Sequence, residues 1–282
     1  MAADPGNVPA TLSVSLVLFH QALDQLRPTV ASLAAAAWQA REAGLLERCI
    51  VWLIDNGGHD ASALDRVVRD ALAPGVPWLA LEVIRGHGNV GYGQGHNLAL
   101  TRSTAEWHLV LNPDVLVDRE ALVAGLRYLE THPRVGLGAP RAEGETSRQY
   151  LCKRHPSLLV LGLRGFAPTA LRQRFRGLLD RYEMRDLSDE TPTEGIPIAS
   201  GAFMLCRRAA LQEIGGFSPD YFLYFEDFDL SLRLGRRWTI AYLPSMRIRH
   251  AGGDAAGKGW AHQRMFIRSG LTFFRRHGWR LW

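Results

Sequence analysis

WHLVLNPDV, from Trp107 to Val115, is a short apolar run that stops abruptly. Leu109 to Leu111 have the apolar character of a buried strand. Pro113 holds Asn112 in an extended conformation and has no backbone N–H to donate, so the strand has to end there. Asp114 therefore emerges at the carboxyl end of a buried strand.

Three similar apolar runs precede this one, and helical stretches separate them. Strands are predicted at Leu12–Phe19, Cys49–Asp55 and Trp78–Arg85, and helices at Leu26–Ala43 and Ala61–Leu72. This alternation predicts βαβ units, and therefore an α/β fold with a mostly parallel sheet. Ligands bind beyond the carboxyl ends of the strands in such sheets, so the polar clusters at those ends are the first candidates for a site.

The composition is that of a globular protein. The chain has 282 residues, of which 47% are hydrophobic, and one large domain over residues 1–282 is expected. Its three cysteines lie far apart, so neither a disulfide framework nor a zinc site is predicted, and a reducing cytoplasm is expected. The apolar run near the N-terminus is too short for a signal anchor or a membrane span.

The net charge of +5 is unevenly distributed. Residues 141–185 hold ten Lys or Arg against four Asp or Glu, and residues 258–282 hold six against none. Such segments favour a phosphate-bearing partner or an anionic membrane surface, unless they form a solvated basic face. No nucleic-acid recognition motif is visible, so nucleic acid is not an expected partner.

Arginine also marks an amphipathic stretch, Phe166–Asp186, which is predicted to be one helix. Its apolar side either covers the core or rests on a membrane at the inner face of the cell. The aromatic and basic C-terminal stretch has the same character.

Two polar clusters follow strands in the first half. Asp55 and Asn56 can aim a carboxylate and an amide at a base or a ribose, or they form a plain turn. The stretch Gly86–Leu100 holds five glycines ahead of a helix, where free N–H groups suit phosphate or ribose oxygens. It is neither a Walker A loop nor a GxGxxG fingerprint directly after a strand, so alone it is a weak signal.

Asp114 has two interpretations. A carboxylate on a sharp strand end can bind a hard divalent cation, which in turn holds a diphosphate. It can also cap the helix that follows, but Asp118 fits that role better.

Three carboxylates crowd the apolar run YFEDFDLSLRL, from Tyr224 to Leu234. If this run begins a helix, Asp229 and Arg233 are i and i+4 and pair on one face. Glu226 and Asp227 then lie in the first turn, where the helix dipole favours acids whether or not they have a catalytic role. Upstream, IPIASGAFMLCRR is predicted to be a strand with Ser200 and Gly201 at its mouth, or an ordinary strand and turn.

An ordered set of motifs carries a family resemblance from about Ser13 to the C-terminus: IDNGGHD, GNVGYGQGHN, LNPDV, SGAFMLCRRAALQEIGGFSPDYFLYFEDFDLSLRL and RIRHAGG. The set resembles the inverting family 2 glycosyltransferases, and within them the rhamnosyltransferase-type enzymes of bacterial polysaccharide assembly. The resemblance implies a GT-A fold, with a Rossmann-like nucleotide-sugar-binding half at about 12–117. An acceptor-binding half with basic helices would follow at about 118–282.

The resemblance also assigns roles to residues of this sequence. Its donor would be a nucleotide sugar, most simply dTDP-L-rhamnose, held with Mg²⁺ or Mn²⁺. Its acceptor would be a polysaccharide or a polyprenyl-linked glycan. Asp114 and His250 would bind the metal, and Asp227, with Glu226 beside it, would be the catalytic base. The donor-binding set would be Asp55, Asn56, Asn89, Gly91, Gly95, Asn97, Asn112, Asp114, Ser200, Gly201 and Lys258.

Two departures from the family pattern stand out. Asn112 replaces the first carboxylate of the metal-binding DxD motif, which removes one anionic ligand. Phe19 and His20 stand where relatives carry a Tyr-Asn pair, which leaves the share of the first strand in nucleoside binding open.

Three hypotheses follow. Inverting sugar transfer needs a carboxylate that takes the acceptor proton and positive charge that stabilises the leaving diphosphate, and this chain offers both. The second hypothesis is a non-catalytic nucleotide- or carbohydrate-binding module. The third, a Rossmann-type oxidoreductase, lacks a glycine fingerprint after its first strand.

Overall fold

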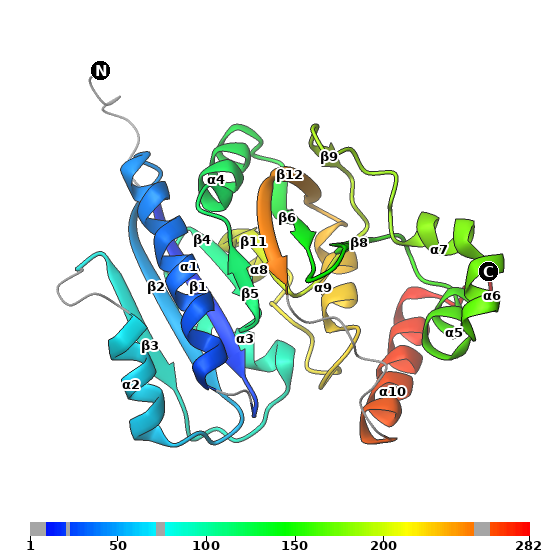
Figure 1. Ribbon diagram of the computed structural model, residues 1–282, viewed down its shortest axis with the longest axis horizontal. Coiled ribbons are helices and arrows are strands. Elements are labelled where there is room, and N and C mark those ends of the chain that lie inside the picture. The colour runs from blue at the N-terminus through cyan, green and yellow to red at the C-terminus, as the bar shows by residue number, and fades with distance from the viewer. Residues whose placement is uncertain (1–9, 21–22, 72–76, 251–259) are drawn as a thin grey trace.

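The computed structural model describes residues 10–20, 23–71, 77–250 and 260–282. A single large sheet runs through the molecule (Figure 1). Its central strands lie in the order β3 (Leu79–Ile84), β2 (Leu46–Asp55), β1 (Ala10–Leu18), β4 (Trp107–Leu111), β11 (Phe203–Arg207), β6 (Val135–Glu143), β12 (Thr239–His250) and β5 (Val115–Val117).

The sheet changes character in the middle. β3, β2, β1 and β4 are all parallel, as the βαβ pattern predicts. β11 runs antiparallel to both β4 and β6, while β12 is parallel to β6 and antiparallel to β5. The smaller strands β7 (Arg148–Gln149) and β9 (Thr193–Glu194) extend this sheet, and β8 (Cys152–Lys153) pairs with β10 (Ile198–Ala199) apart from it.

Helices pack on both faces of the sheet. α1 (Leu23–Glu42), α2 (Ala61–Ala71) and α4 (Ala121–Thr131) share one buried core with the strands. α3 (Tyr92–Leu100), α8 (Arg208–Glu213) and α9 (Glu226–Leu234) contribute to the cores on the other face. The alternation of β1 accounts for both contacts, because Leu16 joins the first core and Val17 packs with Ala99 of α3.

A buried polar cluster fixes α3 on the sheet. Ser15 Oγ of β1 lies 2.6 Å from Nδ1 of His96 in α3 and 3.0 Å from Nε2 of His108 in β4. Burial lowers the pKa of His108 to about 3, so its ring is neutral. These two histidines therefore position α3, which begins at the glycine-rich loop.

Two predictions about elements need correction. The basic stretch 166–186 is not one helix: α5 (Leu158–Phe166), α6 (Thr169–Arg174) and α7 (Arg176–Tyr182) are short and separate. Their apolar side chains cover the core only in part, because Tyr182 is buried whereas Leu171 is 42% and Phe175 is 37% exposed. Pro168 ends α5 because it leaves Ala167 in an extended conformation.

The predicted strand over residues 196–208 is also interrupted. β10 belongs to the small sheet and β11 to the large one, and a turn at Ser200 to Ala202 connects them. The last helix, α10 (Trp260–His277), lies beside α5, α6 and α7 at the end of the molecule that carries the C-terminus (Figure 1). None of the helices that the structure describes is long and apolar enough to span a membrane.

Candidate active site

Asp114 and His250 meet at the carboxyl edge of the sheet. Asp114 follows β4, and His250 is the last residue of β12. β12 pairs with β5 so that His250 lies opposite Val115, the neighbour of Asp114. Nε2 of His250 is 3.4 Å from Oδ1 of Asp114. Two residues 136 positions apart in the sequence, both assigned to metal binding by resemblance, are thus brought together.

Gln149 fixes the orientation of the His250 ring. Its side-chain nitrogen donates to the His250 carbonyl over 3.0 Å, and its Oε1 lies 2.7 Å from Nδ1 of the ring. Because an amide oxygen can only accept, Nδ1 has to carry a proton. Nε2 is therefore the ring nitrogen that faces Asp114. No sequence motif marks Gln149, and only the pairing of β7 with β6 brings it here.

This pair has the donor chemistry of a divalent-cation site. A carboxylate oxygen and an imidazole nitrogen are both metal ligands, and metal-binding histidines usually have their other ring nitrogen hydrogen-bonded. Ligand atoms 3.4 Å apart can both touch one cation at bond lengths of about 2.1–2.3 Å. Over the described ranges, no group of three or more His, Cys, Asp or Glu side chains forms a fuller cage. Asp114 and His250 therefore fit a cation that takes its remaining ligands from elsewhere.

Glu226 and Asp227 occupy the first turn of α9, as predicted. The two residues before them, Tyr224 and Phe225, have left-handed φ angles of 70° and 64°. Such angles are unusual outside glycine and cost about 1–3 kcal/mol each, so other contacts have to stabilise the turn.

The last helix provides those contacts. Phe225 packs against Phe266 and Phe273 of α10, with ring centroids 5.1 and 5.3 Å apart. The Tyr224 hydroxyl and Nδ1 of His262 in α10 are 2.9 Å apart. The aromatic residues around the acidic motif therefore fix the direction in which its carboxylates point.

The two carboxylates differ in their environment. Asp227 accepts hydrogen bonds of 2.9 Å from the N–H of Gly201 and from the N–H of Phe228. Burial raises the pKa of Asp227, while these two N–H groups oppose that rise. Burial and the charge of Asp227 raise the pKa of Glu226 to about 8. Asp227 is therefore the member of the pair that gives up its proton more readily, and Glu226 holds its proton more tightly.

Tyr92 lies within the motif GNVGYGQGHN, although no role was predicted for it, and it connects the two parts of the site. Its hydroxyl lies 2.8 Å from Oδ1 of Asn112 and 2.7 Å from the carbonyl oxygen of Gly201. Burial raises the pKa of Tyr92 well above its ordinary value, and the charges of Glu226, Asp227 and Asp114 raise it further. The pKa of this one hydroxyl therefore depends on the carboxylates of both the acidic motif and the strand end.

Asp55 and Asn56 lie at the end of β2 and are both buried. Burial alone would raise the pKa of Asp55, but the ring and the N–H of His59 lower it below its ordinary value. The amide nitrogen of Asn56 donates to the Gly91 carbonyl over 2.9 Å, and its Oδ1 is 2.9 Å from Nε2 of His87. Asn56 therefore ties the glycine-rich loop to the sheet.

The loop residues have distinct tasks. Asn89 accepts a hydrogen bond from the N–H of Gly91, whose φ of 84° favours glycine. A Cβ on Gly95 would lie 2.7 Å from Val17, so glycine lets α3 approach β1. Asn97 exchanges two hydrogen bonds, of 2.8 and 2.9 Å, with the backbone of Phe217.

Two predicted site residues remain. Ser200 lies in the turn between β10 and β11, next to Gly201, whose N–H contacts Asp227. Lys258 lies outside the described residues.

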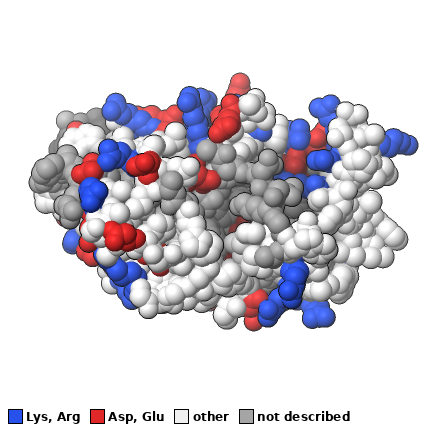
Figure 2. Space-filling model, turned by 60° about the horizontal axis from the view of Figure 1, so that its bottom comes forward, with Lys and Arg blue, Asp and Glu red and all other residues white. Residues whose placement is uncertain are grey.

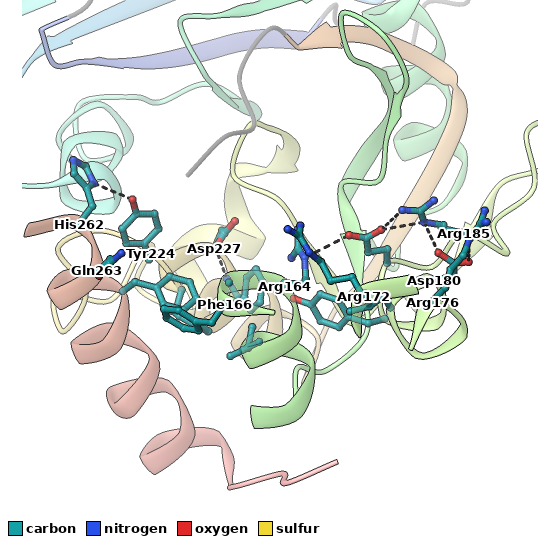
Figure 3. A pocket seen from close by; sticks show the side chains of 18 of the residues that line it. Arg164, Phe166, Arg172, Arg176, Asp180, Arg185, Tyr224, Asp227, His262 and Gln263 are labelled. Atoms are coloured by element: carbon teal, nitrogen blue, oxygen red, sulfur yellow. Dashed lines mark hydrogen bonds and ion pairs between the residues drawn. The ribbon is translucent and has the colours of Figure 1, made fainter. Parts of the chain in front are cut away.

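A cavity of about 860 Å³ opens beside the acidic motif. Residues of α5, α6 and α7, the first turn of α9 and one side of α10 line it. Asp227 lies between an aromatic side with Tyr224 and His262 and a side with Arg164 and Arg172 (Figure 3). Both Glu226 and Asp227 line this cavity, so a bound molecule can reach this pair of carboxyl groups.

Comparison with known proteins defines the class of this chain. Residues 21–265 match the family described as Glycosyltransferase like family 2, and the chain belongs to that family. It is 30% identical, over 81% of its length and 76% of the relative, to the N-acetylglucosaminyl-diphospho-decaprenol L-rhamnosyltransferase of Mycobacterium tuberculosis. It is 25% identical to rhamnosyltransferase WbbL of Escherichia coli, over 61% of this chain and 65% of that protein.

Solved structures show the same fold. The mannosyltransferase PcManGT from Pyrobaculum calidifontis, in complex with GDP-Man and Mn²⁺, superposes with a TM-score of 0.61 at 17% identity, over 97% of this chain and 66% of that one. GalNAc-T7 with UDP, GalNAc and Mn²⁺ gives 0.64 at 15% identity, over 95% and 48%. The chain is therefore a glycosyltransferase of GT-A fold, as the resemblance implies, and the oxidoreductase hypothesis is wrong.

Proposed function

We propose that this protein is an inverting rhamnosyltransferase that moves L-rhamnose from dTDP-L-rhamnose to a saccharide hydroxyl. The acceptor in this proposal is a sugar carried on a lipid diphosphate, the class that the name of the mycobacterial relative specifies. The observation that supports it most is the position of Asp227. It is the member of a buried carboxylate pair that gives up its proton more readily, and it lines an 860 Å³ cavity.

The reaction then follows from the placement of the charges. The acceptor oxygen attacks the anomeric carbon while its proton passes to Asp227. The bond from that carbon to the nucleoside diphosphate breaks on the opposite face, and its electron pair leaves with the diphosphate. Glu226, protonated at neutral pH, can donate a hydrogen bond to the acceptor from beside the base.

The proposed binding site for the nucleotide-sugar donor lies at the carboxyl edge of the sheet. Asp114 and His250 would hold Mg²⁺ or Mn²⁺, which supplies positive charge to the leaving diphosphate. Asp55, Asn89 and Gly91 would surround the nucleotide at the ends of the strands. The division into a donor half at about 12–117 and an acceptor half at about 118–282 belongs to this proposal.

A membrane-facing end is consistent with a lipid-linked acceptor. Fifteen large apolar side chains are exposed in the described part of the chain, and eleven of them lie in residues 158–175 and 260–282. At this end of the molecule, a broad surface without charges is framed by Lys and Arg (Figure 2). We propose that this end contacts anionic lipid at the inner face of the cell membrane.

A panel of nucleotide sugars with and without Mg²⁺ or Mn²⁺ tests the donor assignment. dTDP-L-rhamnose should raise the melting temperature of the protein when metal is present, because it binds only the folded state. Asp114→Asn should lose the part of the shift that depends on metal. A larger shift with a UDP- or GDP-sugar would replace the donor while keeping the reaction. No shift with any sugar nucleotide would contradict the proposed function.

A further inference from the structure

The cavity beside Asp227 has one basic wall. Arg164 of α5, Arg172 of α6, Arg176 of α7 and Arg185 all line it. Asp180 and Glu183 are the carboxylates that lie on the same side. Four permanent positive charges therefore face two negative ones on this wall, before the Glu226–Asp227 pair is considered.

Asp180 and Glu183 form shorter ion pairs with one of the arginines than with the others. Arg185 is 3.0 Å from Asp180 and 2.7 Å from Glu183, while Arg176 and Arg164 have longer contacts of 3.4 and 3.5 Å with these carboxylates. The wall therefore keeps positive charge that its own acids do not neutralise.

Arg172 differs from the other three arginines in its contacts with carboxylates. Its Nε donates to the Ala167 carbonyl over 3.0 Å, and it forms no ion pair with any residue in the described ranges. The two terminal nitrogens of its guanidinium group remain available for an anion. Figure 3 shows Arg172 beside Arg164, on the side of Asp227 that faces Asp180 and Arg185.

We propose that this arginine wall is the subsite for the diphosphate of the acceptor. The inference rests on the proposed function, in which the acceptor is a saccharide on a lipid diphosphate. A diphosphate carries about two negative charges, which match the excess on the wall, and a guanidinium group binds phosphate oxygens in pairs. The sugar would lie against Asp227, and the diphosphate would lie against Arg172 and Arg164.

The surroundings of the wall provide a path for the lipid. Phe166 lines the same cavity and is 65% exposed, and Leu171, one residue before Arg172, is 42% exposed. A chain that leaves the diphosphate would therefore meet apolar side chains at the rim. The cavity of about 860 Å³ lies within the range of about 300–1,000 Å³ that is usual for small-molecule sites.

Two soluble acceptors that differ only in the diphosphate test this assignment. One is N-acetylglucosamine on a short alkyl diphosphate, and the other is the matching alkyl glycoside; both are assayed in neutral detergent, without a membrane. Arg172→Gln is compared with Arg174→Gln, because Arg174 lies on the same helix, is exposed and does not line the cavity.

The wild type should show a lower KM for the diphosphate acceptor than for the glycoside. Arg172→Gln should raise the KM for the diphosphate acceptor by about tenfold or more, the effect of losing a hydrogen bond to a charged group. Its KM for the glycoside and for the donor should stay unchanged, as should every parameter of Arg174→Gln.

Other results overturn the assignment in distinguishable ways. If both acceptors have the same KM, or if Arg172→Gln changes neither, the protein remains a glycosyltransferase but the wall binds no acceptor diphosphate. If Arg172→Gln raises the KM for the donor instead, the wall serves the nucleoside diphosphate. If donor binding persists and the wild type glycosylates neither acceptor, the proposed acceptor class fails, and the subsite fails with it.

Discussion

Glu226, Asp227 and Asp229 lie within four residues of one another, yet each has a different environment. Asp227 is held by two backbone N–H groups, and Glu226 is buried with its Oε2 free of any hydrogen bond from the residues described. Asp229 pairs with Arg233 as the spacing predicts, over 2.6 Å. The crowding therefore does not require three buried charges of the same kind, because Glu226 is neutral at pH 7 and Asp229 is paired.

The raised pKa of Glu226 should make the stability of the folded protein depend on pH. Its pKa is about 8 in the folded protein, whereas the ordinary pKa of a glutamate, which the unfolded chain keeps, is 4.5. Between these pH values the unfolded chain releases a proton that the folded protein retains, so the stability of the wild type falls as pH rises. Glu226→Gln is neutral at every pH and removes this dependence.

Thermal denaturation of both proteins at pH 5 and pH 8 checks this prediction. The difference in melting temperature, Glu226→Gln minus wild type, should be larger at pH 8 than at pH 5 by about 3 °C or more. A constant difference across this range would mean that Glu226 is ionised in the folded protein.

At the scale of elements, α10 holds α9 in place through a contact that the sequence did not predict. Nε2 of His277, at the end of α10, lies 2.8 Å from Oδ1 of Asp229, which is fully buried. The i and i+4 spacing predicts the contact with Arg233, but His277 is 48 residues away in the sequence. The direction of the catalytic turn therefore depends on a contact between two helices.

Loss of this buried carboxylate should loosen both helices. Asp229→Asn leaves Arg233 and His277 without their anionic partner, and we expect it to lower the free energy of unfolding by about 3 kcal/mol. Asp220→Asn is the matched control, since the Asp220–Arg276 pair is exposed and is worth at most about 1 kcal/mol. Urea denaturation of the two variants checks the difference; equal losses would show that Asp229 does not join the helices.

Local patterns predicted most of the elements and failed where distant segments meet. β1 to β4 and the helices between them follow from apolar runs and from Pro113, which are local signals. Asn97 anchors Phe217 by two hydrogen bonds that the sequence did not predict, and no role was predicted for Tyr92 or Gln149. Their roles depend on strand register and on loop contacts over long separations, which no local pattern contains.

At the scale of the whole molecule, most of the exposed large apolar side chains of the described residues lie in 158–175 and 260–282, at the end where Lys and Arg surround an uncharged surface (Figure 2). This end should bind vesicles that contain anionic lipid, and the binding should weaken as salt screens the arginines. Trp282→Ala should reduce binding about fivefold, because Trp282 is 86% exposed and tryptophan favours the membrane interface.

Vesicle co-sedimentation at low and high salt measures this effect. Trp38→Ala is the control, since Trp38 is also exposed but lies on α1 at the other side of the molecule. Equal effects of the two substitutions, or binding to neutral vesicles at high salt, would contradict an interface at this end.

The proposed reaction depends above all on Asp227 taking the proton of the acceptor. The rate of sugar transfer by Asp227→Asn probes this step directly, with donor binding measured on the same protein and Asp220→Asn as control. We expect transfer to fall by about 10²–10⁴-fold with donor affinity unchanged, because only the base is lost. Turnover close to that of the wild type would contradict this role and would place the base elsewhere.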